Sequence, residues 1–346
     1  MGKTKGVTSR KNTGDSFNVA VDVGRSSVKL VTASSRTSFP FLIATKKSST
    51  ADYYIPADRI QKQAEVDGKM YFFGEEATLL GESVIQHTEG PAFKEASIAA
   101  TLFSIAYMMM FDDDYQSKVN LAINLTFDNH YQKSEYAEAL KGEHTVRFLR
   151  EDEEITFTVE HVFVLYQGFS GLVSVAMDEN FKVRKDYLSS EGVVVDVGRQ
   201  TIDFLYVENM VVKAGSSKDF GTFKIYEKVV DLLKRKHSVV KEPFEIEEHL
   251  TENRPITLLD GGKIQLAPIV KEAVQFYFDD VLAHFSTFLS KRTPDYLLLL
   301  GGGALVYGPF FKEKFKLVEV PADPQFSNAE GMYRFLDQAI SRNGSR

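Results

Sequence analysis

The sequence contains no cysteine among its 346 residues. This absence excludes disulfide bonds, iron–sulfur clusters and thiolate chemistry, and it leaves the cellular compartment undetermined. No apolar run approaches the roughly 20 residues that a membrane-spanning helix needs. The longest candidate, residues 98–111, is interrupted by Thr101 and Ser104 and predicts a buried helix.

Basic residues are not in excess either, since 41 Lys and Arg stand against 48 Asp and Glu and the formal net charge is −7. A broad basic face for direct DNA binding is therefore not expected. The small basic cluster at residues 234–237 is typical of a solvated helix end, where the helix dipole favours positive charge. Residues 1–16 carry four basic side chains among Gly, Ser, Thr and Asn, and they lack the apolar core of a signal peptide. We expect them to form a disordered tail.

An apolar pattern occurs twice along the chain. The runs at 17–22 and 27–32 flank Asp-Val-Gly and predict a β-hairpin, and the same arrangement recurs at 192–198 and 201–207. In each half the hairpin is followed by a small insertion, a helix and a strand. An internal duplication of an α/β unit explains this order.

The length and the 43% hydrophobic content suffice for two domains. We expect domain I at 17–165, with an insertion at about 36–90 and with the C-terminal segment 323–346. Domain II is expected at 166–322, with an insertion at about 221–292. Within domain I, the pattern predicts a helix at 92–111 and strands at 118–125 and 162–166.

The two Asp-x-Gly turns are candidates for phosphate and metal binding. A tight turn presents several backbone N–H groups in a small concavity that binds phosphate oxygens. Gly24 and Gly198 permit close approach of a ligand, and Asp22 and Asp196 at the strand ends are suited to hydrated Mg²⁺. One Asp-x-Gly alone is typical of an ordinary turn, so the interpretation depends on the matched pair.

Side chains on the returning strands extend this chemistry. Lys29 follows Asp22 by seven residues and reaches phosphates as a point charge. Thr201 and Asp203 occupy the second hairpin, where Asp203 is suited to organising water.

A run of leucines at 297–300 leads into Gly301, Gly302 and Gly303. The sequence predicts a buried strand, a glycine turn and a helix, and the helix N-terminus suits adenosine and α-phosphate contact. The alternative for the glycines is a flexible β–α loop. Tyr307 either lies against a base or belongs to the core.

These motifs together resemble those of the actin superfamily, which also includes sugar kinases and the seventy-kilodalton heat-shock chaperones. Residues 22–29 look like phosphate loop one, residues 196–203 like phosphate loop two, and residues 300–307 like the adenosine motif. The resemblance implies an actin-like (ribonuclease-H-like) duplicated two-domain α/β fold with a nucleotide cleft between the domains.

Three further segments resemble ParM-type bacterial actins. Residues 66–77 look like a strand pair that ends in Gly-x-x-Ala, and residues 323–331 look like the C-terminal motif. Residues 120–126 match a strand that ends in Gly-Leu-Pro in that group, but Asn124, Leu125 and Thr126 stand here instead. The resemblance implies a cytoplasmic ATPase that forms filaments of its own copies for plasmid segregation. Its implied partner is a DNA-binding adaptor of the ParR type on a plasmid centromere, with no direct contact to DNA or membrane.

The resemblance also implies roles for single residues. The implied catalytic residues are Gln167, which would orient water, Asp196 and Asp22, and the two aspartates also hold the metal. The alternative for Gln167 is a polar residue that caps the following helix. The implied contacts to ATP or GTP are Gly24, Ser26, Ser27, Lys29, Gly198, Arg199, Gln200, Thr201, Asp203, Gly221, Lys224, Gly301, Gly302, Gly303, Ala304 and Tyr307. Whether Arg25 and Arg199 face solvent or the phosphates stays open.

Two other functions remain as alternatives. A small-molecule kinase of the same superfamily needs a base, usually Asp, directed at a substrate hydroxyl, and we find no such signature beside Gln167. An actin relative of the cell-shape, division or pilus type usually carries an amphipathic membrane helix, whereas residues 341–346 are polar.

Overall fold

The computed structural model describes residues 16–45, 62–74, 77, 84–85, 91–111, 116–149, 151–178, 180–290 and 292–344. The expected disordered tail, residues 1–16, lies outside these ranges except for Ser16. Two compact units make up the chain: Met1–Val183 with Phe326–Arg346, and Arg184–Gln325. Our domain boundaries at 165/166 and 322/323 stay a prediction, because the halves of a duplication and compact units need not end at the same residues.

The first unit is built on one sheet. Its described elements are β1 (Phe17–Val23), β2 (Ser27–Val31), β3 (Arg36–Pro40), β4 (Ile43–Ala44), β5 (Lys62–Val66), β6 (Lys69–Phe73), β7 (Val84–Ile85), α2 (Pro91–Met109), β8 (Lys118–Leu125), the 3-10 helix η1 (Phe127–Gln132), α3 (Lys133–Leu140), β9 (Gly142–Phe148), β10 (Glu153–Tyr166), α4 (Phe169–Ala176) and α10 (Ser327–Gly344). Among the described residues, ten strands form this sheet, in the order β3-β2-β1-β8-β10-β9-β5-β6-β4-β7.

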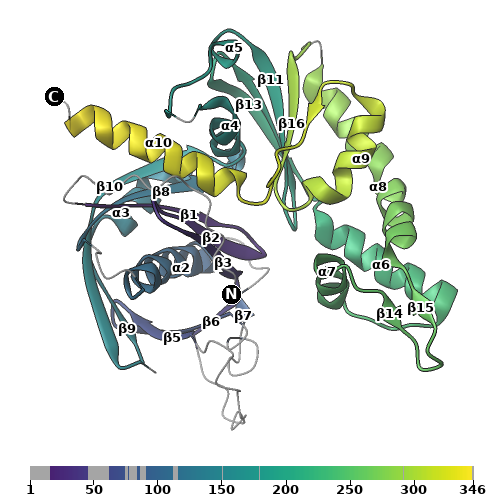
Figure 1. Cartoon of the computed structure of the whole chain (residues 1–346), viewed down its shortest axis with the longest axis horizontal. Coiled ribbons are helices and arrows are strands. Elements are labelled where there is room, and N and C mark those ends of the chain that lie inside the picture. The colour runs from purple at the N-terminus through teal and green to yellow at the C-terminus, as the bar shows by residue number, and fades with distance from the viewer. Residues whose placement is uncertain are drawn as a thin grey trace. The chain divides into compact units, whose positions relative to one another are not determined.

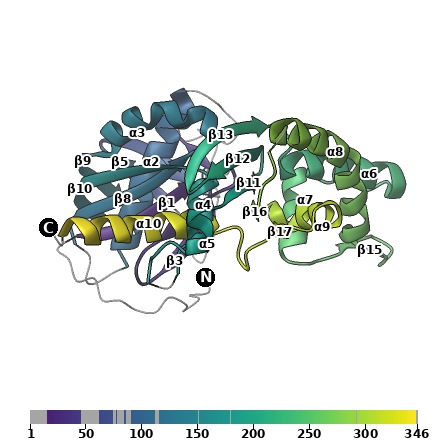
Figure 2. The same ribbon diagram turned by 90° about the horizontal axis from the view of Figure 1, so that it is seen from above.

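Helices cover both faces of this sheet around β1. Val19 and Val21 pack in one core with Phe103 of α2, and the sheet curls around that helix (Figure 1). Ala20 packs in a second core with Met332 of α10, which runs along the strands (Figure 2). A strand that is buried on both faces needs apolar side chains at successive positions, and this explains Val19, Ala20 and Val21 in β1.

The second unit is built on a smaller sheet. Its described elements are α5 (Lys185–Leu188), β11 (Glu191–Val197), β12 (Ile202–Glu208), β13 (Val211–Lys218), α6 (Thr222–His237), α7 (Pro243–Thr251), β14 (Ile256–Thr257), β15 (Lys263–Ile264), α8 (Leu266–Leu289), β16 (Tyr296–Leu300), α9 (Ala304–Lys314) and β17 (Val318–Glu319). The main sheet has the order β13-β12-β11-β16-β17, and β14 and β15 form a separate pair.

The two sheets repeat one topology. In the first, β3, β2 and β1 are antiparallel neighbours, and β8 and β10 continue in parallel. In the second, β13, β12 and β11 are antiparallel neighbours, and β16 and β17 continue in parallel. The expected duplicated two-domain α/β fold is confirmed. The two predicted hairpins, one in each half, are confirmed as β1–β2 and β11–β12.

Strand β10 differs from our prediction, which placed a strand only at 162–166. The strand has 14 residues, pairs with β9 in its first half and with β8 in its second, and carries a register shift between Val159 and His161. Alternation had marked the missed part, since Ile155, Phe157 and Val159 are buried while their neighbours are not. The predicted strand at 118–125 is confirmed as β8, and the predicted helix at 92–111 as α2. Of the helices in the described ranges, none is long and apolar enough to cross a membrane.

Candidate functional site

The first hairpin places an ion pair at its turn. Asp22 and Lys29 are directly opposite each other in the β1–β2 register, and Lys29 Nζ lies 3.3 Å from Asp22 Oδ2. Both residues are buried, with 3% and 8% of their surface exposed. The Gly24 amide donates a hydrogen bond of 3.0 Å to Ser27 O and closes the turn. The predicted neighbours Asp22, Gly24 and Lys29 are thus assembled within one unit.

The turn also fits a phosphate oxygen. Among the described residues, the buried Ser27 hydroxyl has no hydrogen-bond partner. A Cβ at Gly24 would lie 3.6 Å from Lys29 Nζ, so glycine keeps the space beside the ammonium group open. Buried donors normally find a partner, and an anion beside Lys29 would supply one.

The other residues of this loop are tied to their surroundings. Ser26 O accepts a hydrogen bond of 3.0 Å from the Phe41 amide. The Arg25 guanidinium lies 3.8 Å from the centre of the Phe93 ring on α2. This stacking gives Arg25 a place against α2.

The second hairpin carries a carboxylate where the first carries lysine. Asp196 and Asp203 are directly opposite each other in the β11–β12 register, with 2% and 3% of their surface exposed. Thr201 Oγ1 donates a hydrogen bond of 2.9 Å to Asp203 Oδ2, and the Gly198 amide donates one of 2.9 Å to Thr201 O. Two buried carboxylates at one turn are suited to a divalent cation.

Helix α6 begins directly on this second loop. The amides of Gly221, Thr222 and Phe223 donate to the carbonyls of Gln200, Gly198 and Arg199 at 2.8, 3.1 and 2.8 Å. A Cβ at Gly221 would lie 2.3 Å from Arg199 O, so this approach requires glycine. Gly221, Gln200 and Gly198 are therefore brought together within the second unit.

Two predicted contacts of this region have protein partners. Lys224 Nζ donates to Asp219 O at 2.7 Å and pairs with the Asp219 carboxylate at 3.1 Å. Arg199 Nη1 lies 2.9 Å from Glu247 Oε2 on α7, which gives Arg199 its position. Burial raises the pKa of Glu247, and the Arg199 guanidinium lowers it in part. Within the described part of the chain, the buried Nε of Arg199 has no hydrogen-bond partner, so this loop too contains a donor suited to an anion.

The glycine turn after β16 lies against the second hairpin. Gly301 has φ +77°, and a Cβ there would lie 2.5 Å from both Asp196 Oδ1 and Val197 O. The Gly303 amide donates to Val197 O at 3.0 Å, and the Gly301 amide donates to Pro324 O at 2.9 Å. Gly302 is exposed, and Ala304 is buried at the start of α9. These bonds favour a fixed turn over the flexible loop that was the alternative.

Tyr307 is fully buried, and its hydroxyl donates a hydrogen bond of 2.9 Å to Phe220 O. Burial raises its pKa. This placement favours the interpretation of Tyr307 as a core residue over contact with a base.

Gln167 lies between β10 and α4 in the first unit. Its backbone amide donates a hydrogen bond of 2.8 Å to Leu125 O at the end of β8, and its side chain is half-buried. The next residue, Gly168, is the N-cap of α4 and has φ +80°. The helix cap itself comes from Asn328, whose Oδ1 accepts from the amides of Gly168 and Gly171. Asn328 lies in the C-terminal motif at 323–331, and no local pattern in that motif indicates a chemical role for it.

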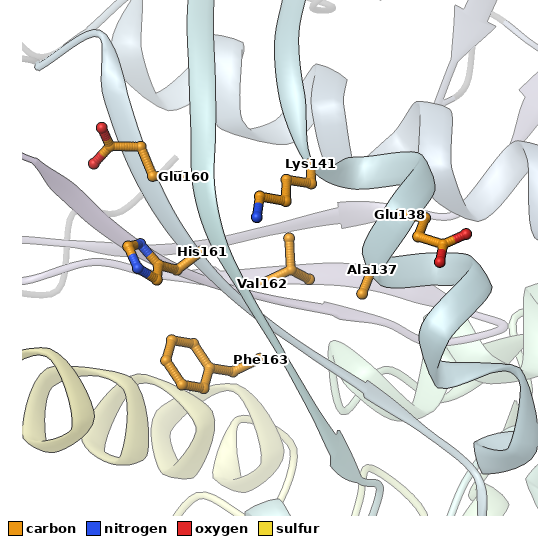
Figure 3. A pocket seen from close by; sticks show the side chains of 7 residues that line it. All are labelled: Ala137, Glu138, Lys141, Glu160, His161, Val162 and Phe163. Carbon is orange, nitrogen blue, oxygen red and sulfur yellow. The ribbon is translucent and has the colours of Figure 1, made fainter.

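A separate pocket in the described part of the first unit does not include these residues. A pocket of about 340 Å³ lies between α3 and β10 and is lined by Ala137, Glu138, Lys141, Glu160, His161, Val162 and Phe163 (Figure 3). It has no glycine turn and none of the predicted site residues, so we do not assign the nucleotide to it. In the described ranges, no group of three or more His, Asp or Glu residues is arranged to hold a metal.

Comparisons with known proteins agree with this architecture. Residues 20–169 match the family described as the N-terminal domain of actin-like proteins, and residues 194–313 match the C-terminal domain of MreB-like archaeal actin homologues. No protein with curated annotation matches the sequence.

Solved structures resemble the chain over almost its whole length. An archaeal actin homologue, Ta0583, has a TM-score of 0.75 at 18% identity over 93% of this chain and 99% of that one. The actin-like protein Alp7A has a TM-score of 0.73 at 15% identity over 95% of this chain and 98% of that one. ParM from a 15-stranded filament of Clostridium botulinum has a TM-score of 0.68 at 17% identity over 93% of this chain and 99% of that one.

The fold therefore defines a duplicated, actin-like α/β protein. Both halves of the chain match actin-like families, and the chain belongs to the actin superfamily. The fold that the resemblance to ParM-type proteins implied is confirmed.

Proposed function

We propose that this protein is a nucleotide-driven ATPase that assembles into actin-like filaments and acts in plasmid DNA segregation in the cytoplasm. The observation that carries the proposal is the pair of matched hairpins. Each ends in a buried aspartate at the same register position and holds a buried donor, Ser27 Oγ or Arg199 Nε, that lacks a partner within the described residues. Two such turns with complementary charges suit a triphosphate and its metal.

The residues divide this work by their charge. Lys29, the Ser27 hydroxyl and the turn amides of the first loop would bind phosphate oxygens. Asp196 and Asp22 would hold hydrated Mg²⁺, and a bound Mg²⁺ neutralises charge on the phosphates. Gln167 is a neutral amide, so it would orient water for in-line attack rather than act as a strong base. Slow hydrolysis of this kind suits a timer of filament life.

The proposed partners follow from the same reasoning. Similar structures include a ParM filament and an Alp12 filament, which supports assembly of copies of this chain. A head-to-tail contact that does not close into a ring gives a filament. The net charge of −7 suits an adaptor of the ParR type that carries the basic DNA contacts.

Sedimentation of the full chain at micromolar concentration tests assembly. We expect a pellet with ATP and Mg²⁺, none without nucleotide, and less when EDTA removes the metal. Parallel assays with GTP would determine the preferred base. Phosphate release without polymer under every condition would contradict the filament and would favour a kinase. Transfer of a phosphoryl group to added small hydroxyl compounds would then reveal the kinase.

The Gln167→Ala variant tests the hydrolytic role. We expect phosphate release to slow by roughly 10- to 100-fold, because the water loses its orientation. Nucleotide affinity and pelleting should stay as in the wild type. Loss of nucleotide binding would instead assign Gln167 a structural role.

A further inference from the structure

The N-terminus of α4 is capped by a side chain distant in sequence. The first amides of an α-helix have no partner within the helix, and a nearby Ser, Thr, Asp or Asn usually accepts from them. Here the cap position is Gly168, which has no side chain to offer. Asn328 of α10 supplies the acceptor instead. Its Oδ1 accepts from the Gly168 amide at 3.0 Å, the Gly171 amide at 3.0 Å and the Ser170 hydroxyl at 2.8 Å.

Gln167 directly precedes this cap. On its strand side, the Gln167 backbone amide donates a hydrogen bond to Leu125 O, and Tyr166 stacks on His130 with ring centres 3.6 Å apart. On its helix side, the Gly168 amide is bonded to Asn328. The Gln167 backbone is therefore restrained from both sides, and the helix-side restraint comes from the C-terminal helix.

The position of Asn328 is itself closely determined. Asn328 has 4% of its surface exposed. One turn later, a Cβ at Gly331 would lie 1.7 Å from Ser170 O, so α10 packs on the backbone of α4. Between them Glu330 pairs with Arg36 of β3 at 2.7 Å. These contacts leave the Asn328 acceptor little freedom to move, and they explain why the motif at 323–331 contains both Asn and Gly.

We propose that Asn328 is a positioning residue for Gln167: by capping α4 it sets the direction from which the Gln167 side chain leaves the turn. The inference rests on the proposed role of Gln167 in hydrolysis. A displacement of about 1 Å at a reacting group can cost roughly 100-fold in rate, so a distant cap can control the chemical step. Asn328 acts through Gln167 and leaves nucleotide affinity to the two hairpins.

Phosphate release and nucleotide affinity are measured on the full chain and four variants. Asn328→Ala removes the acceptor and should slow hydrolysis roughly tenfold or more without weakening nucleotide binding. Asn328→Asp keeps the acceptor, and its charge suits a helix N-terminus, so it should stay within about threefold of the wild type. Asn328→Ser keeps a shorter acceptor, and its hydrolysis rate should lie between those of Asn328→Ala and Asn328→Asp. This variant carries the test if Asn328→Ala does not fold. Ser174→Ala removes a different hydrogen bond of α4, from Ser174 Oγ to Gly171 O, and should leave the rate unchanged.

A double variant separates positioning from general loosening of the fold. If Asn328 acts through Gln167, Asn328→Ala should add little in a Gln167→Ala background, because residues that act as a unit are not additive. Two independent losses that multiply in full would overturn the proposal. So would wild-type hydrolysis in Asn328→Ala when Gln167→Ala is slow.

Amide hydrogen exchange gives a readout without nucleotide. The amides of Gly168 and Gly171 should exchange at least roughly tenfold faster in Asn328→Ala than in the wild type, while amides of α2 stay unchanged. Unchanged exchange at both glycines would overturn the cap. A wild type that shows the cap but hydrolyses no nucleotide would instead defeat the proposed function, so the two failures are distinguishable.

Discussion

The two hairpins have the same backbone pairing and differ in the charge of one buried side chain. In each, an aspartate is the last residue but one of the first strand, and a glycine amide closes the turn. The returning strand places a buried residue directly opposite the aspartate. That residue is Lys29 in the first hairpin and Asp203 in the second. The duplication has therefore kept the geometry of the turn and exchanged the sign of one side chain.

The exchange has energetic consequences. In the first hairpin the Lys29 ammonium compensates the buried Asp22 carboxylate at 3.3 Å. In the second, two carboxylates occupy opposite positions of a strand pair, an arrangement that destabilises a sheet without a cation or donors. The first loop is thus suited to phosphate and the second to metal, and the first two comparisons below test this division.

The largest effect is expected from Asp196→Ala. Phosphate release should fall by roughly 10²- to 10³-fold, as for other losses of a charged group that stabilises the transition state. Asp22→Ala should also slow the reaction, but with a smaller change in the Mg²⁺ concentration that gives half-maximal rate. An unchanged rate in Asp196→Ala would remove this residue from the site, and equal metal dependence in both variants would end the distinction between the loops.

The second comparison concerns stability. Lys29→Ala leaves the Asp22 carboxylate buried without its ion pair and should lower the free energy of unfolding by about 3 kcal/mol. Asp203→Asn keeps an oxygen for the Thr201 hydroxyl and relieves repulsion with Asp196, so it should change that free energy by under about 1 kcal/mol. Urea unfolding of the nucleotide-free proteins measures both. Equal losses in the two variants would mean that the charge exchange has no structural consequence.

The third comparison separates two adjacent glycines. Gly301→Ala places a Cβ 2.5 Å from Asp196 Oδ1 at a positive φ and should cost about 2 kcal/mol. Gly302→Ala has its nearest neighbour, Gln325 Cγ, at 4.0 Å and should be close to neutral. Thermal unfolding of the two variants checks this difference. A neutral Gly301→Ala would show that the turn moves away from Asp196 without cost.

The smallest effect concerns the two loop arginines and pH. Because burial raises the pKa of Glu247 above its value in the unfolded chain, its contribution to stability is greatest at low pH and falls as pH rises through the folded-state pKa. Arg199→Gln removes the charge that offsets this, so its cost should be larger at pH 7 than at pH 4. Arg25→Gln loses a contact with the Phe93 ring and should show no such pH dependence. A cost for Arg199→Gln that is the same at both pH values would contradict the role of Glu247.

Local pattern was enough for the hairpins, for β8 and for the glycine turn, because each is encoded by neighbouring residues. The β9–β10 hairpin also carried a readable alternation, which a search limited to continuous apolar runs overlooks. Local pattern did not predict the partners of Arg199 and Asn328. Glu247 and Gly168 lie 48 and 160 residues from them in the chain, and no local spacing indicates which side chains the fold brings together.

Strand β10 gives the first unit a mechanical property. Its first half pairs with β9, which carries β5 and β6, and its last residue, Tyr166, adjoins Gln167. One hydrogen-bonded strand thus runs from the inserted strands to the turn that is proposed to orient water, with the bulge at Val159–His161 as its irregular point. A force that a neighbouring molecule applies to β5 and β6 would reach Gln167 along a continuous hydrogen-bonded strand rather than through a loop.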